Sequence, residues 1–397
     1  MKLASRLDHI EPFYVMEMAK IARAMADGPD CDPRQGGEPM IYLNIGEPDF
    51  TASARVREAA SSCLQSGRTQ YTPATGLPAL RRAISGWYRD RWQLDVSPER
   101  IVVTAGASAA LQLITLALFE SGDEVLMPDP CYPCNRHFVT ATGATSKLIP
   151  TTAKQRFQLD VAAVQSHWSD RTRGVLLASP SNPTGTSVAP QELDAIVRAV
   201  RARGGVTLVD EIYLGLSFDA NFGRTALALG EDVISINSFS KYFGMTGWRL
   251  GWLVLPPELV APVEKLAQNL YICASAVAQH AALSCFEAES IADYEQRRGE
   301  FARRRDLVVE GLNRLQLTVP VVPDGAFYAW ACTDAHTDSS WDLCFDVLQR
   351  AHVVLTPGRD FGPALAEHYL RLSYANSLPH LTTALQRLER ALGSKRP

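Results

Sequence analysis

The sequence lacks a dense cysteine pattern, a strong net charge and a long apolar run, although it extends over 397 residues. Its eight cysteines are scattered, and the one CxxC motif, Cys131 to Cys134, has no second pair that would complete a zinc site. We therefore expect reduced thiols, no disulfide framework and no metal site. A net charge of −4 is too small to attract nucleic acid or an anionic membrane by bulk charge.

Apolar stretches of two diagnostic lengths are also missing. No run of signal-peptide length follows the first charged residues, and no uninterrupted stretch of about 18 apolar residues appears later. We expect a cytoplasmic protein without a membrane partner. No internal repeat or low-complexity tract is visible, so neither a repeat array nor a disordered chain is indicated.

The length and composition indicate a globular chain with more than one core. Hydrophobic residues make up 46% and charged residues 21%, which is ordinary globular usage. Because a single core stops growing at roughly 250–300 residues, this chain is expected to form two lobes. We predict an N-terminal arm over residues 1–46, a large domain over 47–287 and a small C-terminal domain over 288–397, with the arm packed on the small domain.

The middle of the chain, from about Ile101 to Leu255, alternates short apolar runs with helical patterns. This alternation is typical of an α/β lobe in which a doubly wound, mostly parallel sheet is wrapped by helices. Helices are predicted at Ser108–Phe119 and Pro190–Arg203. The predicted strands are Ile101–Thr104, Glu124–Pro128, Gly174–Ala178, Val206–Val209, Val233–Ile236 and Gly251–Leu255.

The two ends of the chain have a different texture. After about Glu287, the pattern predicts a smaller α+β domain. Its predicted elements are a long charged helix through Glu300–Leu315, strands at Leu317–Val322 and Ala326–Cys332, a helix near Trp341–Ala351 and a final helix from Pro379. The N-terminal part contains an amphipathic segment, Val15–Met25, and a Gly/Pro-rich stretch, Gly28–Pro39, that we predict to be an exposed loop.

Lys241 lies where a ligand-binding lysine would be expected. It follows the predicted strand Val233–Ile236, and in open α/β sheets the carboxyl ends of the strands face the ligand crevice. A lysine that is partly removed from water has a lowered pKa, which makes it a nucleophilic amine able to form an imine with an aldehyde. A solvated surface lysine is the alternative.

Three further loops follow predicted strands in the same way. Asp210 ends the strand Val206–Val209, where a carboxylate can hold a pyridine nitrogen protonated or simply cap the next turn. Asn182 lies in a rigid Pro- and Gly-containing loop and can donate to an oxygen, although an ordinary Asn-Pro turn looks the same. Ala107 and Ser108 open a helix whose amino terminus would favour phosphate, although a close strand-to-helix turn with no ligand looks the same in sequence.

Together these features resemble the fold-type I pyridoxal-phosphate (PLP) enzymes, specifically the class I aminotransferase family. The resemblance rests on the order and spacing of Asn182–Gly185, Asp210 with Tyr213, Ser238-x-x-Lys241 and Arg249, and it extends from Pro12–Met16 and Asn44–Phe50 to Arg371–Ala375. It implies a PLP-dependent aminotransferase that moves the α-amino group of an amino acid to a 2-oxo acid, by a ping-pong mechanism through an imine with Lys241.

The resemblance also implies roles for individual residues at the cofactor. Lys241 would carry the cofactor and move a proton, and Asp210 would pair with the pyridinium nitrogen. Asn182 and Tyr213 would bind the phenolic oxygen, and Tyr132 would stack on the ring. The phosphate would be bound by Ser238, Arg249 and the amides of Ala107 and Ser108.

Substrate and subunit contacts are implied as well. Arg371 resembles the residue that binds the substrate α-carboxylate, with the Gly46 backbone and Asn182 nearby. Tyr71 resembles the tyrosine that reaches the partner subunit's phosphate, which implies a homodimer with shared active sites. Family members often have a tryptophan where Tyr132 stands, and no second arginine matches a dicarboxylate clamp, so aspartate specificity is not indicated.

Two other functions fit the same scaffold. A PLP-dependent carbon–sulfur β-lyase, or another fold-type I PLP enzyme, would act without an amine acceptor. A non-catalytic PLP-binding regulator would usually add a DNA-binding domain, and this sequence has no basic extension long enough to form one. The sequence does not name the preferred amino acid or oxo acid, because side-chain specificity depends on the shape of the pocket.

Overall fold

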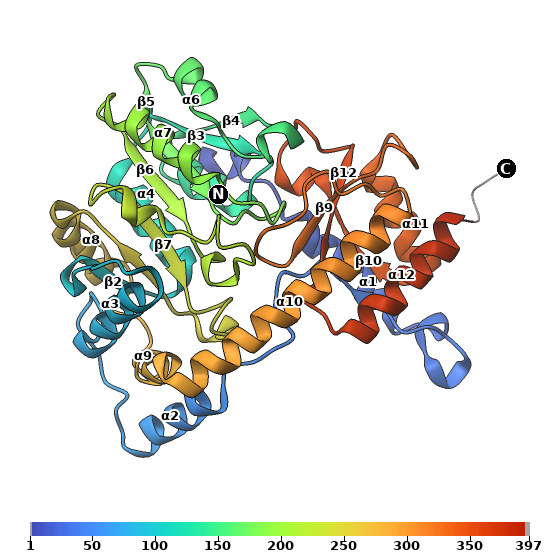
Figure 1. Ribbon diagram of the computed structural model, residues 1–397, viewed down its shortest axis with the longest axis horizontal. Coiled ribbons are helices and arrows are strands. Elements are labelled where there is room, and N and C mark those ends of the chain that lie inside the picture. Colours follow the sequence, from blue (N-terminus) through green and yellow to red (C-terminus); the bar gives the residue numbers. More distant parts are fainter. Residues whose placement is uncertain (1, 394–397) are drawn as a thin grey trace.

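A seven-stranded sheet forms the centre of the larger lobe in the computed structural model, which describes residues 2–393 (Figure 1). The strand order is β2-β8-β7-β6-β5-β3-β4, and only β8 runs against its neighbours. The prediction of a mostly parallel sheet is therefore confirmed. The strands are β2 (Ile101–Thr104), β3 (Glu124–Asp129), β4 (Thr145–Pro150), β5 (Thr172–Ala178), β6 (Val206–Asp210), β7 (Ile234–Ser238) and β8 (Gly251–Val254).

Six of these strands match the predicted ones to within two residues at each end, and β4 was not predicted. β4 lies at the edge of the sheet, and only Ile149 of its six residues is buried. Because an edge strand of this kind has no continuous apolar run, its sequence carries little strand signal.

Helices cover both faces of this sheet, as expected for a doubly wound fold. Along β3, Val125 and Met127 pack in one core cluster, whereas Leu126 packs in another on the opposite face. The first cluster includes side chains of α4 (Gly106–Leu118) and α8 (Pro257–Leu270), and the second includes side chains of α6 (Val161–His167) and α7 (Pro190–Arg201). Alternation along the strands thus buries both faces of the sheet.

Further α-helices precede the C-terminal part of the chain. They are α2 (Ala54–Gln65), α3 (Pro78–Trp92), α5 (Pro133–Ala141) and α9 (Ala276–Ala282). The long helix α10 (Ala288–Arg314) then runs across the molecule toward the smaller group of strands (Figure 1).

The smaller part combines short strands with helices, which confirms the predicted α+β character. Strands β11 (Thr356–Pro357), β12 (Tyr369–Ser373) and β9 (Tyr328–Cys332) form an antiparallel sheet, and β1 (Ile41–Tyr42) pairs in parallel with β10 (Val353–Val354). The accompanying helices are α11 (Ser340–Ala351) and α12 (Leu378–Gly393). No helix in the described range is both long and apolar enough to span a membrane.

The predicted strand Leu317–Val322 is wrong. The segment makes only one isolated bridge, from Thr318 to Cys332. Pro320 interrupts it, and a proline cannot donate to a strand ladder. The Gly28–Pro39 stretch contains two single-turn 3-10 helices, Pro29–Cys31 and Pro33–Gln35, and is exposed for the most part, although Cys31 is buried.

The predicted amphipathic segment, Val15–Met25, forms the N-terminal helix α1 (Tyr14–Ala26). It contacts β10 and β11, and its buried residues Met18 and Ala22 join the main core cluster. The preceding single-turn helix, Ser5–His9, contacts α5 instead. The segment that precedes α1 therefore contacts the larger lobe, whereas α1 itself packs against strands of the smaller part.

Candidate active site

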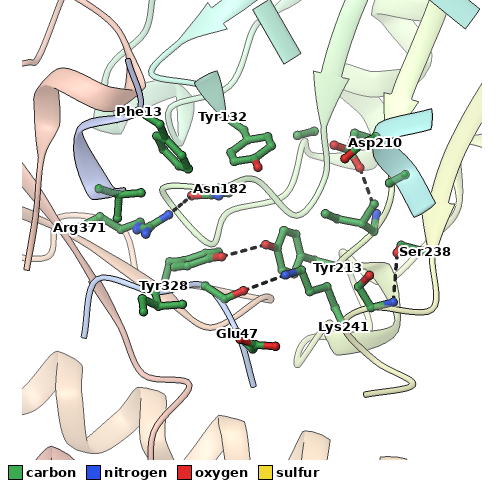
Figure 2. A pocket seen from close by; sticks show the side chains of 18 of the residues that line it. Phe13, Glu47, Tyr132, Asn182, Asp210, Tyr213, Ser238, Lys241, Tyr328 and Arg371 are labelled. Atoms are coloured by element: carbon green, nitrogen blue, oxygen red, sulfur yellow. Dashed lines mark hydrogen bonds between the residues drawn. The ribbon is translucent and has the colours of Figure 1, made fainter. Parts of the chain in front are cut away.

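A cavity of about 450 Å³ opens at the carboxyl ends of β5, β6 and β7, beneath α1 and next to β9 and β12 (Figure 2). It is within the size range of small-molecule sites. Eleven of the predicted site residues line it, namely Gly46, Ala107, Ser108, Tyr132, Asn182, Asp210, Tyr213, Ser238, Lys241, Arg249 and Arg371. Tyr71 does not line it, and its side chain is 80% exposed.

Lys241 follows β7 and points into this cavity. Its Nζ donates a hydrogen bond to the Gly46 carbonyl at 2.7 Å (Figure 2). Burial lowers the pKa of Lys241 to about 8, and Glu47 opposes that shift while Arg249 and Arg371 add to it. The amine is thus more often neutral near neutral pH than an ordinary lysine, which is the form that attacks an aldehyde.

Asp210 ends β6, the strand next to β7, and is buried at the same cavity. Its carboxylate accepts from the Ile212 amide at 3.3 Å and from Asn135 Nδ2 at 3.4 Å, and both contacts are long. Burial raises the pKa of Asp210 to about 6. A buried carboxylate with two weak, neutral donors suits a cationic N–H partner, and the protonated pyridine nitrogen of PLP is such a partner.

The amino terminus of α4 and Arg249 form an anion-binding corner. Ala105, the residue before α4, gives no side-chain cap, so the first-turn amides, including those of Ala107 and Ser108, are open to a ligand. A Cβ on Gly106 would lie 2.7 Å from Arg249 Nη2, and Gly106 has a φ of +82°. Glycine therefore lets the guanidinium approach the helix end, where both favour a phosphate.

Arg371 on β12 is 2% exposed and lies between two aromatic rings. Its guanidinium carbon is 4.5 Å from the Tyr328 ring centroid and 4.9 Å from that of Phe361. Nη1 donates to Asn182 Oδ1 at 2.8 Å, and Nε is buried with no hydrogen-bond partner. Within residues 2–393 no acidic side chain forms an ion pair with Arg371, so this cation is available to a carboxylate ligand.

Two tyrosines connect the lysine side of the cavity to the arginine side. Tyr213 and Tyr328 share a hydrogen bond between their hydroxyl groups at 2.9 Å, and burial raises the pKa of Tyr213 well above its ordinary value. A Cβ on Gly46 would lie 2.0 Å from the Tyr328 hydroxyl, so only glycine fits there. Tyr132 precedes α5 and meets Phe13 edge to face at 6.3 Å.

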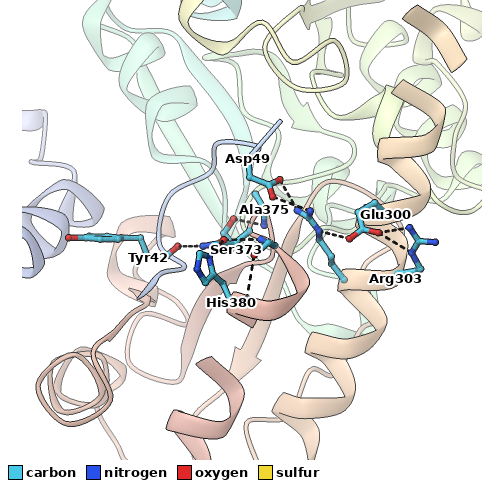
Figure 3. Close-up of polar contacts among 10 residues, drawn as sticks. Tyr42, Asp49, Glu300, Arg303, Ser373, Ala375 and His380 are labelled. Carbon is cyan, nitrogen blue, oxygen red and sulfur yellow. Dashed lines mark hydrogen bonds and ion pairs between the residues drawn. The ribbon is translucent and has the colours of Figure 1, made fainter. Parts of the chain in front are cut away.

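The segment that carries Gly46 is fixed by α10. Asp49 accepts from Arg304 Nη1 at 2.8 Å and from Nη2 at 3.1 Å, and Glu300 accepts from Arg304 Nε at 3.1 Å (Figure 3). Arg304 is buried, so the paired charges are partly shielded from water. This bidentate contact holds the backbone near the acceptor of the Lys241 hydrogen bond.

Several residues at or beside the cavity had no predicted role, and four of them bear on the site. Asn135 contacts Asp210, Tyr328 supports Arg371, and Phe13 and Glu47 line the cavity. Phe13 and Glu47 fall within the segments that carried the family resemblance, which was the available signal for them. Asn135 and Tyr328 give no local signal, because one is an internal helix residue and the other an apolar strand residue whose neighbours are distant in sequence.

Known proteins that are similar to this chain in sequence and structure are aminotransferases. The family model described as aminotransferase class I and II matches residues 38–388. The valine–pyruvate aminotransferase of Mycobacterium tuberculosis is 36% identical over 380 residues, which cover 96% of each chain. A crystal structure of an aminotransferase from the same organism has a TM-score of 0.93 at 34% identity, with full coverage of both chains.

A more distant solved relative extends the same agreement. The aspartate aminotransferase from Thermus thermophilus, determined with maleate, has a TM-score of 0.90 at 31% identity and covers 98% of this chain and 100% of its own. The cavity's lysine, carboxylate and anion-binding corner fit the cofactor of these enzymes. The chain therefore belongs to the aminotransferase class I and II family and is a PLP-dependent aminotransferase that acts on amino acids and 2-oxo acids.

Proposed function

We propose that Lys241 and Asp210 are the two residues on which amino-group transfer in this enzyme depends. The observation that supports this most directly is that both line one cavity from adjacent strands, β7 and β6, whose pairing is parallel. Lys241 would be the attachment residue for the cofactor, and Asp210 would hold a proton on the ring nitrogen.

The bound cofactor supplies an acceptor for the electrons left behind when the substrate's Cα–H bond breaks. The protein's part is proton transfer and orientation. Lys241 Nζ would take the proton from the substrate α-carbon and return it to the carbon on the far side of the substrate nitrogen, two bonds away. Taking the proton requires a neutral amine. Burial, which lowers the pKa of this amine, supports that role. Asn182 and Tyr213 would bind the ring's phenolic oxygen.

Arg371 would fix the substrate by its α-carboxylate. The guanidinium is buried, stacked between two rings and bonded to Asn182, so its donors have a defined direction. A carboxylate held in that direction would set which bond at the α-carbon breaks, because geometry selects the bond. The Gly46 backbone, which approaches both Lys241 and Tyr328, would form the neighbouring wall.

The remaining predicted residues would bind the cofactor's periphery. The phosphate would lie at the α4 amino terminus, against the amides of Ala107 and Ser108, the Ser238 hydroxyl and Arg249. Tyr132, half-buried and in edge contact with Phe13, would cover one face of the ring.

We also propose a homodimer in which Tyr71 completes the partner's site. Tyr71 is highly exposed in a stretch of exposed residues and lies outside its own chain's cavity. A large aromatic side chain in that position suits a subunit contact. The eight free thiols suit a reducing, cytoplasmic compartment. Residues 1–46, 47–287 and 288–397 would be the arm, large domain and small domain, a division supported by the start of α10 at Ala288.

The experiment that tests this function follows the PLP-loaded enzyme spectroscopically with one amino acid and no acceptor. An aminotransferase converts once and stops, and added pyruvate restores turnover; valine and pyruvate are the first pair to use, since they name the M. tuberculosis relative. A parallel assay uses L-cysteine, whose β-elimination with water gives pyruvate, ammonia and sulfide; continuous pyruvate release from it without an acceptor would favour a β-lyase. Lys241→Ala should abolish both the visible absorbance of the attached cofactor and the conversion, and turnover retained in that variant would refute the role of Lys241.

A further inference from the structure

The wall of the cavity above Arg371 is apolar and comes from the start of α1. Phe13, Val15, Met16 and Ala19 all line the cavity, and Met16 is 56% exposed although it is a large apolar side chain. An exposed apolar residue at the rim of a cavity is typical of a surface that a ligand covers.

Two side chains attach this wall to the rest of the site: Asn44 Nδ2 donates to the Val15 carbonyl at 3.2 Å, and the carboxylate of Asp360 binds the start of α1. Asp360, which is 1% exposed, accepts hydrogen bonds from the amides of Tyr14 and Val15, one at each oxygen and both at 2.7 Å. The N-cap residue of α1, Phe13, has no side-chain acceptor of its own. The first turn of α1 therefore depends on a residue 346 positions away for the capping that a local Asp or Ser usually supplies.

Asp360 lies in the same short helix as Phe361, whose ring packs against Arg371. That helix, Gly358–Phe361, follows β11, and the Phe361 ring stacks on the Arg371 guanidinium. Arg371 and Arg136 are the cations that act electrostatically on Asp360. This short helix, together with Asn44, which bonds both Val15 and Arg371, thus sets the distance between the apolar wall and the residue proposed to bind the α-carboxylate. The substrate side chain must project into that space.

Charged residues at the cavity do not form a matching site for a second carboxylate. Glu47 lines it and accepts a hydrogen bond from Thr246, so its negative charge opposes an acidic substrate. Arg23 also lines it, but is exposed and lies two turns of α1 beyond Met16. The apolar residues are nearer to the end of α1 that Asp360 holds.

We propose that Asp360 is a positioning residue that holds α1 as the side-chain wall of the substrate site, and that this wall selects amino acids with apolar side chains. The inference rests on the proposed function, because it takes Arg371 as the α-carboxylate site. Loss of one Asp360 oxygen as an acceptor would loosen the wall without touching the reacting atoms. Substrate affinity should then fall more than the rate of the chemical step.

The test is the single half-reaction of PLP-loaded enzyme with L-valine or L-aspartate, in which concentration dependence separates an apparent Kd from a limiting rate. The unchanged enzyme should prefer valine by at least about tenfold in the ratio of limiting rate to Kd, which is the discrimination expected of an apolar pocket. Asp360→Asn places an NH₂ group against an amide N–H. It should raise the valine Kd roughly tenfold and change the limiting rate by less than about threefold.

Asp160→Asn is the matched control, because Asp160 caps α6 through a single oxygen at 2.7 Å and lies outside the cavity. It should leave both quantities unchanged. A second pair of variants covers the case in which Asp360→Asn fails to fold. Met16→Asp should raise the valine Kd by roughly tenfold and reduce the preference for valine, whereas Ala24→Asp, on an exposed part of α1 outside the cavity, should do neither.

Three results would overturn the inference. The first is a preference of the unchanged enzyme for aspartate that Arg23→Ala removes, which would make Arg23 the specificity residue. The second is an Asp360→Asn enzyme that behaves like Asp160→Asn. The third is an equal effect of Met16→Asp and Ala24→Asp. Conversion of no amino acid by the unchanged enzyme is distinguishable from all three, since it would refute the proposed function as well.

Discussion

The two sides of the active-site cavity are built in different ways. On one side, Asn182, Asp210 and Lys241 each follow a strand of the seven-stranded sheet, and those strands, β5, β6 and β7, are neighbours. On the other side, Phe13 directly precedes α1, whereas Tyr328 on β9 and Arg371 on β12 lie more than 300 residues later in the chain. Parallel strands bring their carboxyl ends together by topology alone, whereas the second side depends on how the two ends of the chain pack.

The difference predicts that substitutions on the sheet side change the chemical step. Asp210→Asn replaces the buried carboxylate by a neutral amide, so the ring nitrogen would lose its charged partner. The limiting rate of the half-reaction should fall by on the order of a hundredfold or more, as for the loss of an electrostatic group in a buried site. Stopped-flow spectroscopy with saturating amino acid measures it.

Asp194→Asn is a suitable control for that measurement. Asp194 is a partly exposed residue of α7 that pairs with Arg198 and lies outside the cavity, so its loss should leave the rate unchanged. If Asp210→Asn kept the full limiting rate while losing only affinity, the two sides of the cavity would not differ as proposed.

Substitution on the other side should instead weaken substrate binding. Arg371→Ala removes a buried, stacked cation, and the loss of such a charge contact is about 2–5 kcal/mol, or roughly 30- to several-thousandfold in affinity. Affinity for PLP should change far less. Separate titrations with amino acid and with PLP test this, and equal losses in both would contradict the assigned role. Arg371→Lys should recover part of the affinity only, because it lacks the bidentate geometry.

The same contrast explains how far the sequence could predict the structure. The positions of Lys241, Asp210 and Asn182 at one cavity follow from strand order, so short apolar runs and the residues after them were sufficient. Edge strand β4 escaped detection because five of its six residues are at least partly exposed. The segment Leu317–Val322 was predicted as a strand from its apolar residues. The prediction gave too little weight to Pro320, which cannot donate a hydrogen bond to a neighbouring strand.

The second side could be predicted only in part. Arg371 was found through resemblance, but its stacking on Tyr328 and Phe361 joins residues separated by many positions, and no spacing encodes it. The capping of α1 by Asp360 is a still clearer case. A local N-cap residue is visible in sequence, whereas a cap supplied by a residue from the far end of the chain is visible only after folding.

The third and smallest expected effect concerns the protonation of Lys241, on which charged groups from both sides of the cavity act. With the cofactor removed, only the neutral amine can attack PLP, so the rate of reattachment should follow the titration of this lysine. Burial depresses its pKa from 10.5 to about 8, and the rate should therefore rise about tenfold between pH 7 and pH 9 and then level off. Recovery of visible absorbance in buffers of constant ionic strength gives the midpoint.

Two charge variants show whether the far side of the cavity reaches this lysine. Glu47 raises the pKa of Lys241 and Arg371 lowers it, so Glu47→Gln should move the midpoint to lower pH and Arg371→Gln to higher pH. Phe13→Ala carries no charge change and should leave the midpoint in place. A midpoint that stays in place in both charge variants would show that burial alone sets the pKa of the Lys241 amine. The two sides of the cavity would then be electrostatically independent as well as separately built.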